Sequence, residues 1–405
     1  VFVFAIGYQG TADAADWPQF RGPNRDGKSA ETGLLKKWPE GGPELLWDAE
    51  GLGMGFASVA VADGYVYTTG MVGAEKQGML FAFDTNGNPK WKVSYGRAWS
   101  GAHPGVRTTP TIDGDRLYVI SGYGNLVCFD AKSGKKKWEV DVLKKFNGKN
   151  IRWGISESVL IDGEKVICTP GGKDATVVAL NKITADTIWT TRGLSETSAY
   201  CCPVIIKTGG KRLIATMVQK SVVLIDPENG KVVCRMPHVG KYLISAVSPV
   251  YKDGRIYVTT GYGVGGQMFE LSADATSYTQ KWTDKNLDCH HGGVLLLGGD
   301  IHGSNHNGQG NKGSWICLEM ATGKVKYEAK LVGKGSVIFA DGMMYCYGEN
   351  GKVGLVRVTP TRYEMVSSFQ VTKGTDEHWA HPAISDGRLY IRHGEALMVY
   401  DIKAK

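Results

Sequence analysis

The sequence predicts an all-β fold, an eight-bladed β-propeller of four-stranded antiparallel blades. Two apolar segments joined by a Gly-containing turn recur along the whole chain, about 46 residues apart. A second turn in most repeats is followed by a large side chain at a fixed distance. The 405 residues include 55 Gly, 11 Trp and 18 Tyr, a mixture of turn formers and large rings that favours many short strands over long helices.

The first turn of each repeat lies between two apolar segments. Asp-Gly at such a place is a strong hairpin signal, because glycine tolerates the positive φ that tight hairpin turns require. The eight turns are Asp63-Gly64, Asp113-Gly114, Asp162-Gly163, Gly209-Gly210, Asp253-Gly254, Gly298-Gly299, Asp341-Gly342 and Asp386-Gly387. Their period matches four strands per repeat, which predicts eight blades.

The second half of each repeat carries an Asp-x-x-x-Gly turn or a variant of it, and then a ring position. An aromatic side chain there can pack between neighbouring sheets, so these residues are expected to join blade to blade rather than to bind a cofactor. The ring position is held in chain order by Trp91, Trp138, Trp189, Cys234, Trp282 and Tyr327.

The last repeat ends near residue 402, three strands into its blade. A candidate for the missing outer strand lies at the other end of the chain, where segment 44–48 resembles segment 90–93. Borrowing this N-terminal strand to close the last blade removes the open sheet edges. We therefore expect residues 15–405 to form a single propeller, with an N-terminal arm, residues 15–50, that closes the ring.

The N-terminus is typical of an exported protein. An apolar run over residues 1–6 precedes the small-x-small site Ala12-Asp13-Ala14, so we interpret residues 1–14 as a signal-peptide remnant. A buried first strand is the alternative. The signal predicts a mature protein that is periplasmic or secreted.

Composition argues against an integral membrane protein and against a nucleic-acid partner. No stretch approaches the roughly 18–20 apolar residues needed to span a bilayer, which excludes an integral membrane protein. The net charge of +7 arises from 47 basic and 40 acidic residues, and the basic residues are scattered. This distribution argues against a nucleic-acid partner.

The eight cysteines could form disulfides, but their spacing favours buried free thiols. Cys128 and Cys317 occupy the same strand position of two different repeats, so they cannot meet and are expected to act as small hydrophobic side chains. Only Cys201 and Cys202 could pair locally, through a strained vicinal ring. Their redox state stays open.

All nine histidines fall toward one end of the predicted ring. In a four-stranded blade, the segment entering the first strand and the loop between the second and third strands share one end, and the two short turns share the other. Such a concentration favours a binding face at the channel mouth. The ligand-binding candidates are Arg107, Trp153, Glu157, Tyr200, His290, His291, His378 and His381. Of these, Arg107, Glu157, His291 and His381 are expected to face the channel, because they directly precede a first strand.

The sixth repeat is the densest part of this face. Its entry segment carries His290 and His291, and His302 and His306 lie at or near its loop between the second and third strands. Imidazoles near a carboxylate can ligate a transition metal or supply a general base. The spacing matches no zinc signature, so these four histidines are candidates for an open metal site and not for a closed structural one.

The repeat resembles a known one. The Asp-x-x-x-Gly-x-x-x-Trp pattern is similar to the PQQ-like, tryptophan-docking repeat of eight-bladed propellers, a superfamily with quinoprotein alcohol dehydrogenases and BamB-type assembly scaffolds. Residues 16–27, 290–293 and 379–382 also resemble exported planctomycete-type PQQ-like proteins. The resemblance covers residues 16–405 and is specific for fold, because the family holds both enzymes and scaffolds.

The resemblance implies two classes of function. The first, which we favour, is a periplasmic binding or scaffold protein whose histidine-rich face takes a protein partner or a small polar or carbohydrate ligand. The second is an oxidoreductase that holds PQQ with Ca²⁺ over the channel. Cys201-Cys202 resembles the vicinal disulfide of the dehydrogenases, and Glu157 is a candidate calcium ligand. However, the dehydrogenases are much longer, and no Glu, Asn and Asp set occupies successive blades.

A carbohydrate-active enzyme is the third alternative. A lyase or hydrolase that uses the histidine-rich face would need cationic side chains for an anionic sugar, and Arg107, Arg152 and His291 suit such a ligand. No motif establishes this activity.

Overall fold

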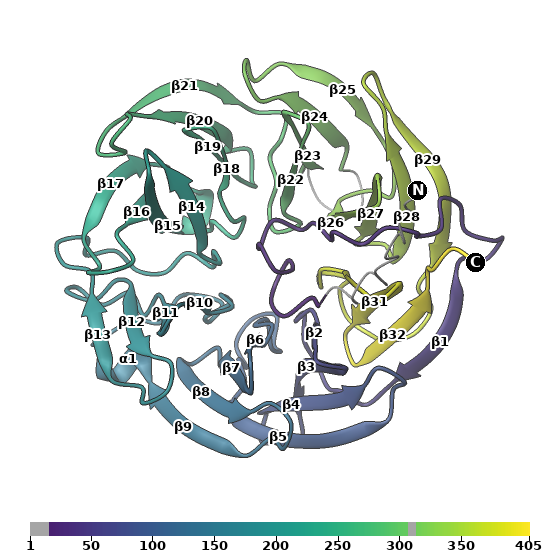
Figure 1. The fold of residues 1–405 in the computed structure, drawn as a ribbon, viewed down its shortest axis with the longest axis horizontal. Coiled ribbons are helices and arrows are strands. Elements are labelled where there is room, and N and C mark those ends of the chain that lie inside the picture. The colour runs from purple at the N-terminus through teal and green to yellow at the C-terminus, as the bar shows by residue number, and fades with distance from the viewer. Residues whose placement is uncertain (1–15, 307–312) are drawn as a thin grey trace, which may run out of the picture.

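The computed structural model describes residues 16–306 and 313–405, which form a closed ring of eight four-stranded antiparallel sheets (Figure 1). This confirms the predicted eight-bladed propeller. Besides 32 strands, the described residues contain one short α-helix, α1 (Val142–Lys145), and one 3-10 segment, Lys241–Leu243. None of their helices is long and apolar enough to cross a membrane. The signal-peptide interpretation of residues 1–14 lies outside the described residues.

Four consecutive strands, named A to D from the channel outward, form each of the first seven blades. Blades one to four are β2 (Ala60–Ala62), β3 (Tyr65–Val72), β4 (Gln77–Asp84) and β5 (Pro89–Arg97); β6 (Thr111–Asp113), β7 (Arg116–Ile120), β8 (Asn125–Asp130) and β9 (Lys136–Asp141); β10 (Leu160–Asp162), β11 (Lys165–Cys168), β12 (Val178–Asn181) and β13 (Thr187–Thr190); β14 (Val204–Thr208), β15 (Lys211–Val218), β16 (Ser221–Ile225) and β17 (Val232–Pro237).

The remaining blades follow the same order. They are β18 (Val250–Lys252), β19 (Arg255–Thr260), β20 (Gly265–Leu271) and β21 (Tyr278–Asp284); β22 (Val294–Leu297), β23 (Asp300–Ser304), β24 (Trp315–Glu319) and β25 (Val325–Ala329); β26 (Gly335–Ala340), β27 (Met343–Gly348), β28 (Lys352–Val358) and β29 (Tyr363–Gln370); and β30 (Ala383–Ser385), β31 (Arg388–His393), β32 (Ala396–Asp401) and β1 (Glu44–Ala49).

The predicted hairpins are the A–B turns of the eight blades. In the first blade, Ala62 pairs with Tyr65 across the turn, and Asp63 and Gly64 have φ values of 50° and 78°. Positive φ at both central positions matches the twist of the flanking strands, and an aspartate followed by glycine accepts it readily. The A–B turns therefore lie at one end of the ring, and the segments entering strand A lie at the other.

The ring positions join neighbouring blades as predicted. The indole nitrogen of Trp91 donates a 2.9 Å hydrogen bond to the carbonyl of Lys132 in the next blade. The turn glycine of that blade, Gly134, has a φ of 69° and lies directly against the Trp91 ring. Trp47, Trp138, Trp189 and Trp282 make the equivalent bond to a carbonyl of the next blade.

The N-terminal strand closes the last blade. Strand β1 pairs antiparallel with β32, from Glu44 opposite Asp401 to Ala49 opposite Leu397. Trp47 thus supplies the ring position of the eighth blade and bonds to the first blade. No blade of the described ring is left with three strands.

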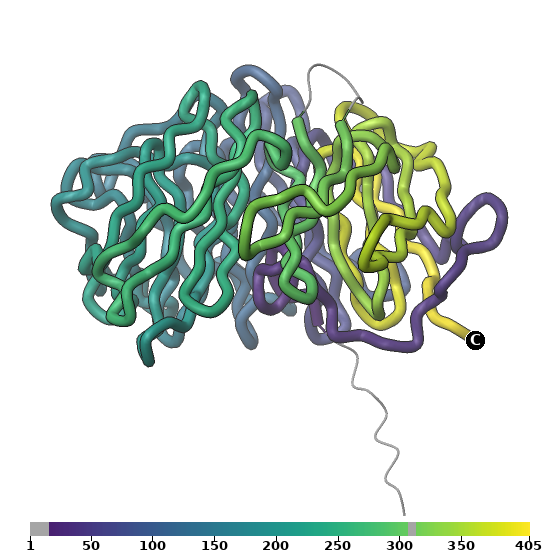
Figure 2. The backbone as a smooth tube through the Cα atoms, turned by 90° about the horizontal axis from the view of Figure 1, so that it is seen from above, coloured from purple at the N-terminus to yellow at the C-terminus, as the bar shows by residue number. Residues whose placement is uncertain are grey.

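Before it reaches β1, the arm crosses the channel and follows the end of the ring that carries the A–B turns (Figure 2). The buried guanidinium of Arg21 donates to the carbonyl of Val294 at 2.7 Å. Arg25, also buried, donates to the carbonyls of Ser158 and Pro203, each at 3.0 Å. The arm therefore binds the inner strands of blades three, four and six and closes this end of the channel.

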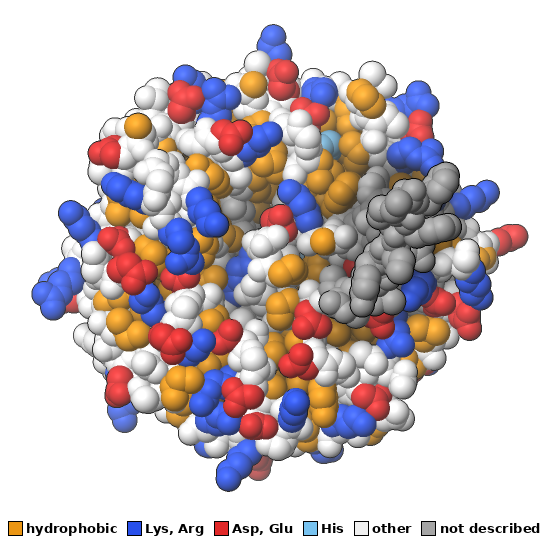
Figure 3. All heavy atoms as spheres, in the orientation of Figure 1, with side chains coloured by type: hydrophobic (Ala, Val, Ile, Leu, Met, Phe, Trp, Pro, Cys, Tyr) orange, Lys and Arg blue, Asp and Glu red, His pale blue; other side chains and the backbone are white. Residues whose placement is uncertain are grey.

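The face with the arm is the one seen in Figure 1. Acidic and basic side chains alternate around it, so this face presents no continuous basic surface (Figure 3).

Candidate functional site

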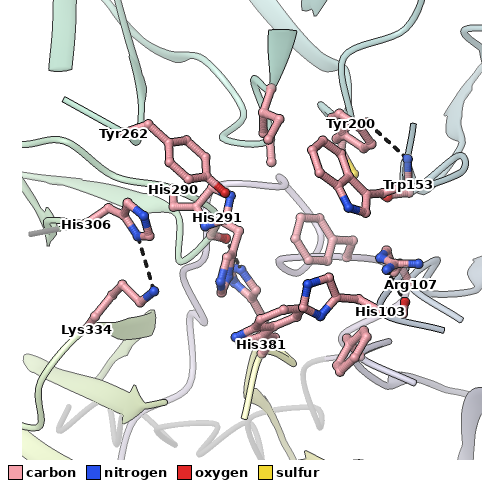
Figure 4. Close-up of a pocket in the computed structure, with 17 residues that line it drawn as sticks. His103, Arg107, Trp153, Tyr200, Tyr262, His290, His291, His306, Lys334 and His381 are labelled. Carbon is pink, nitrogen blue, oxygen red and sulfur yellow. Dashed lines mark hydrogen bonds between the residues drawn. The ribbon is translucent and has the colours of Figure 1, made fainter. Parts of the chain in front are cut away.

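A cavity of about 630 Å³ lies in the channel above the arm (Figure 4). Its walls come from the segments entering strand A and from the B–C loops of blades five and six, at the end of the ring opposite the A–B turns. Phe20 of the arm is also part of the lining, so the pocket is closed at depth by the N-terminal segment. The lining residues are Phe20, Phe56, His103, Arg107, Trp153, Ser156, Tyr200, Cys202, Ile244, Ala246, Tyr262, His290, His291, His306, Lys334, Trp379 and His381.

The structure brings most of the ligand-binding candidates together. Six of the eight line this one cavity, and they are Arg107, Trp153, Tyr200, His290, His291 and His381. They come from blades far apart in the sequence, because each strand A begins beside the channel. Glu157 and His378 do not line the cavity.

Glu157 lies inside the channel wall. It is fully buried, and its Oε1 accepts a hydrogen bond from the backbone nitrogen of Thr169. Burial raises the pKa of Glu157 to about 7, against the opposing effects of Thr169 and the nearby Arg25. Glu157 is therefore not part of the described lining of the cavity, whereas Arg107, His291 and His381 are. Although it precedes a strand A, its side chain turns toward strand B of its own blade.

His378 also points away from the cavity. Its ring stacks on His393 with the centroids 3.6 Å apart, and its Nδ1 lies 2.6 Å from the hydroxyl of Tyr347. Burial and the nearby His393 lower the pKa of His378 to about 4. In the segment that enters the eighth blade, His381 thus lines the pocket, whereas His378 lies between blades seven and eight.

One wall is a cluster of rings. His290 lies with its ring centroid 4.8 Å from both His291 and His306, and Tyr262 lies 4.7 Å from His290 and from His306. Burial, together with the neighbouring imidazoles, lowers the pKa of His290 well below its usual value. His290 is therefore a neutral imidazole whose Nδ1 is buried without a hydrogen-bond partner.

A carboxylate stands behind this wall. Oε2 of Glu349 is 2.9 Å from the ammonium of Lys334, and Oε1 is 3.1 Å from Nε2 of His291, without hydrogen-bond geometry. Lys334 also donates to Nδ1 of His306 at 3.2 Å. Burial alone would raise the pKa of Glu349, but His291 and Lys334 outweigh it and hold this pKa at about 2. Glu349 thus orients two lining side chains without lining the cavity itself.

Arg107 supplies a cation on the opposite side (Figure 4). Its guanidinium donates to the carbonyls of His103 and Gly105 and lies over the ring of Phe56, 5.5 Å from its centroid. Burial lowers the pKa of Arg107 to about 10, so the group stays charged at neutral pH. No carboxylate within ion-pair distance neutralises it among the described residues.

Several side chains of the pocket rest on a strained backbone. Tyr200 has a φ of 78°, Tyr262 of 67° and His103 of 50°. A bulky residue in this region costs of order 1–3 kcal/mol, and such residues cluster at functional sites. Tyr200 is held by its hydroxyl, which accepts a hydrogen bond from the backbone nitrogen of Trp153 at 3.3 Å. All three residues with this strained backbone line the cavity.

The four histidines predicted as metal ligands do not form one set. His302 lies within β23, buried under the next blade, and not at a loop beside the channel. Its Nδ1 is 2.9 Å from the hydroxyl of Tyr363. Only His290, His291 and His306 remain together, and their ring nitrogens do not come within 4.8 Å of one another as a group.

The thiols of Cys201 and Cys202 are unpaired and buried, as are the other six. Cys202 lines the cavity and Cys201 does not.

Sequence reasoning missed seven lining residues, Phe20, Phe56, Ser156, Ile244, Ala246, Tyr262 and Lys334, and also Glu349 behind the wall. Phe20 is part of the segment that resembles exported propellers, but nothing in the pattern shows that the segment enters the channel. Tyr262 lies between two glycines in the B–C loop of the fifth blade. An aromatic residue between two glycines in such a loop is the sequence feature that could have indicated it.

Residues 76–325, more than half of the chain, match the family described as "Outer membrane protein assembly factor BamB". The chain belongs to this PQQ-like propeller family. Among individual relatives of the family, the outer membrane protein assembly factor BamB of Kangiella koreensis is 25% identical over 51% of this chain and 48% of its own length. The quinoprotein alcohol dehydrogenase PedH of Pseudomonas putida is 27% identical over 41% of this chain and 28% of its own. The chain thus spans less than half of either relative.

Solved structures of PQQ-like propellers share the fold at low identity. BamB from Moraxella catarrhalis has a TM-score of 0.62 at 15% identity, covering 89% of this chain and 98% of its own. The quinohemoprotein alcohol dehydrogenase from Comamonas testosteroni has a TM-score of 0.70 at 13% identity, covering 96% of this chain and 81% of its own. Both kinds of protein therefore share this architecture.

The residues of the pocket do not fit the calcium ion of a quinoprotein. Ca²⁺ takes six to eight oxygen ligands, mostly carboxylates and carbonyls. No Asp, Glu, Asn or Gln is among the described residues that line the cavity. Glu157, the candidate ligand, is buried in the channel wall. The charged and imidazole side chains of the described lining are Arg107, Lys334 and five histidines, which are not ligands for Ca²⁺.

Proposed function

We propose that this protein is a binding propeller that captures a small anionic ligand in the pocket at its channel mouth. One observation carries the proposal. The described lining combines Arg107, Lys334 and five histidines with no carboxylate side chain. A concave site with this composition attracts negative charge, and its low-dielectric walls strengthen the attraction.

The two cations suit a ligand with more than one polar group. Arg107 and Lys334 approach the cavity from opposite sides (Figure 4). Lys334 is partly neutralised by Glu349, whereas Arg107 is held only by backbone carbonyls and a ring. Arg107 is therefore the side chain that we expect to contact the anionic group, through a charge-assisted hydrogen bond.

The rings suit a ligand with flat apolar surfaces. Trp153, Tyr200, Tyr262 and Trp379 line the walls, and Phe20 and Phe56 lie with them. Pockets that bind small molecules are typically built from apolar and aromatic side chains with a few polar groups that fix orientation. A ring-bearing acid, such as an acidic sugar, matches both features.

A second candidate function is acid–base chemistry on the same ligand. His291 lines the cavity with its Nε2 3.1 Å from Oε1 of Glu349, so it is the side chain placed to exchange a proton with a bound ligand. Turnover of a bound acidic sugar would distinguish this function from binding alone.

We also infer that the protein is exported to the periplasm or secreted. The inference rests on the apolar N-terminal run with its small-x-small site, and on membership in a family described by an outer-membrane assembly factor. A protein partner on another surface is compatible with the small-ligand pocket.

The test compares a charged ligand with its neutral counterpart. Calorimetric titration with glucuronate and with glucose should show binding of the acid and none of the neutral sugar at the same concentration. Arg107→Ala should weaken glucuronate binding by about tenfold or more, because a charge-assisted bond contributes about 1.5–3 kcal/mol.

Arg97→Ala is the matched control. Arg97 is exposed at the same end of the ring, where β5 ends, and lies over the ring of Tyr123, but it does not line the cavity. Its removal should leave binding unchanged. Equal binding of both sugars, or equal losses in the two variants, would contradict the proposal.

A further inference from the structure

A second polar cluster lies outside the pocket, between blades six and seven. Ligand atoms of Asp300, His302 and Cys317 all lie within 4.8 Å of one another. His302 on β23 faces Cys317 on β24 directly across the sheet, and Asp300 lies two residues before His302 on the same face of the strand. His302 and Cys317 are buried, and Asp300 is partly exposed. Among the described residues, this is the one group with such spacing.

Hydrogen bonding prepares His302 to act as a ligand. The hydroxyl of Tyr363 donates its single hydrogen to the carbonyl of Ile316 at 2.9 Å. Its oxygen therefore accepts from Nδ1 of His302, 2.9 Å away, which places the imidazole hydrogen on Nδ1. The lone pair is then on Nε2. A metal-ligating histidine is usually oriented in this way by a partner on its other nitrogen.

The same strand positions in other blades carry no such set. The position of His302 is a tyrosine in five blades, as the strand register shows for Tyr67, Tyr118, Tyr257, Tyr345 and Tyr390. Blade two also has a cysteine, Cys128, opposite Tyr118, but Arg116 stands where blade six has Asp300. The Arg116 guanidinium lies 3.8 Å from the Cys128 sulfur. Blade two thus places a cation against its sulfur, and blade six places a carboxylate and an imidazole there.

We propose that Asp300, His302 and Cys317 form a binding site for a zinc-class divalent cation, independent of the pocket. Nitrogen, sulfur and carboxylate oxygen are the ligands that Zn²⁺ takes, at about 2.0–2.3 Å, and three protein ligands leave a fourth position for water. Ligand atoms around a tetrahedral zinc ion lie about 3.3–3.7 Å apart, so from a spacing of up to 4.8 Å each pair must approach by up to about 1–1.5 Å.

One neighbouring cation, Lys326, contacts the site. The ammonium of Lys326 is 2.7 Å from Oδ2 of Asp300, so it holds the carboxylate in place and competes for one of its oxygens. A zinc-class cation binds the thiolate, so binding at Cys317 releases the thiol proton to solvent.

The test uses the full chain, stripped of metal with a chelator and titrated with Co²⁺. A cobalt ion bound to thiolate absorbs through a sulfur-to-metal charge-transfer band, which reports the cysteine directly. The wild-type protein should take up one equivalent with this band, and Zn²⁺ should displace the cobalt. Cys317→Ser should abolish the band, and Asp300→Asn, at a partly exposed position, should weaken uptake at least tenfold.

Cys128→Ser is the matched control, because Cys128 occupies the equivalent buried position of blade two. It should leave cobalt uptake unchanged. Failure of the wild type to bind stoichiometric Co²⁺, a band that survives in the folded Cys317→Ser protein, or unchanged affinity in Asp300→Asn would each overturn the proposal. Thermal unfolding of every variant in the presence of chelator separates loss of the site from loss of the fold.

Discussion

At the scale of the residue, Glu349 is the clearest example of a side chain that acts through its neighbours. It holds Lys334 and lies against His291, and both of these line the pocket. Because these neighbours hold its folded-state pKa at about 2, below the unfolded value of about 4.3, its ionised form stabilises the native state. This contribution is fully present above the unfolded pKa and is lost as pH falls toward 2.

Glu349→Gln should therefore destabilise the protein by about 1–3 kcal/mol at neutral pH, because it leaves Lys334 without its partner in a mostly buried site. The difference from the wild type should shrink as pH falls from about 5 to about 2. Urea unfolding across this range measures it.

Glu364→Gln is the control for that prediction. Glu364 pairs with Arg357 and Arg362 on the exposed surface, where an ion pair contributes about 0–1 kcal/mol. A loss in Glu349→Gln that is no larger than in Glu364→Gln, or that does not depend on pH, would contradict the role assigned to Glu349.

At the scale of the element, four of the eight junctions between neighbouring blades place a tryptophan against a turn glycine, with Trp47, Trp91, Trp189 and Trp282 as the rings. Gly134 illustrates the constraint, because a Cβ on it would lie 2.8 Å from the ring of Trp91. Its positive φ disfavours any other residue as well. The Asp-x-x-x-Gly-x-x-x-Trp spacing in the sequence reflects these two requirements, a left-handed turn and space for the neighbouring ring.

Gly134→Ala should lower the free energy of unfolding by more than its positive φ alone explains. Gly193 has a φ of 74°, and no atom of the described residues lies within 4 Å of the position that a Cβ would take there, so Gly193→Ala should cost about 1–2 kcal/mol for its backbone. Gly134→Ala should add about 1–3 kcal/mol from the clash with Trp91. Denaturant unfolding of both variants checks the difference, and equal losses would show that the ring yields without cost.

At the scale of the whole molecule, the N-terminal arm has two structural roles, one in the channel and one in the eighth blade. Residues 17–25 fill one end of the channel, where Arg21 and Arg25 bind backbone carbonyls of several blades. Strand β1 then completes the eighth blade. The first part closes the pocket at depth, and the second part closes the ring.

Two truncations should separate these roles. A chain that begins at residue 29 keeps β1 and should still unfold cooperatively, at reduced stability because buried Trp17 is lost, but it should no longer bind glucuronate. A chain that begins at residue 51 also exposes the edge of β32 and should aggregate or lose cooperative unfolding. Light scattering and calorimetry distinguish the two. Cooperative unfolding of the shorter chain would refute ring closure by β1.

The sequence alone determined the fold, because a propeller repeats one short unit and each repeat carries the residues that form its own turns. The Asp63-Gly64 type of hairpin and the ring position of Trp91 follow from local backbone and packing requirements, and the unpaired last blade pointed to the segment around Trp47. The end of the ring that carries the pocket also followed from strand order.

Only the tertiary structure decided which side chains reach the cavity. His378 and His381 lie three residues apart, yet one stacks on His393 between blades and the other lines the pocket. Glu157 turned into the wall, and Phe20 entered from the N-terminal arm, far along the chain from the histidines that it joins. Strand order places a residue at one end of the ring. The direction of its side chain depends on packing against blades that are remote in the sequence, and no local pattern encodes that.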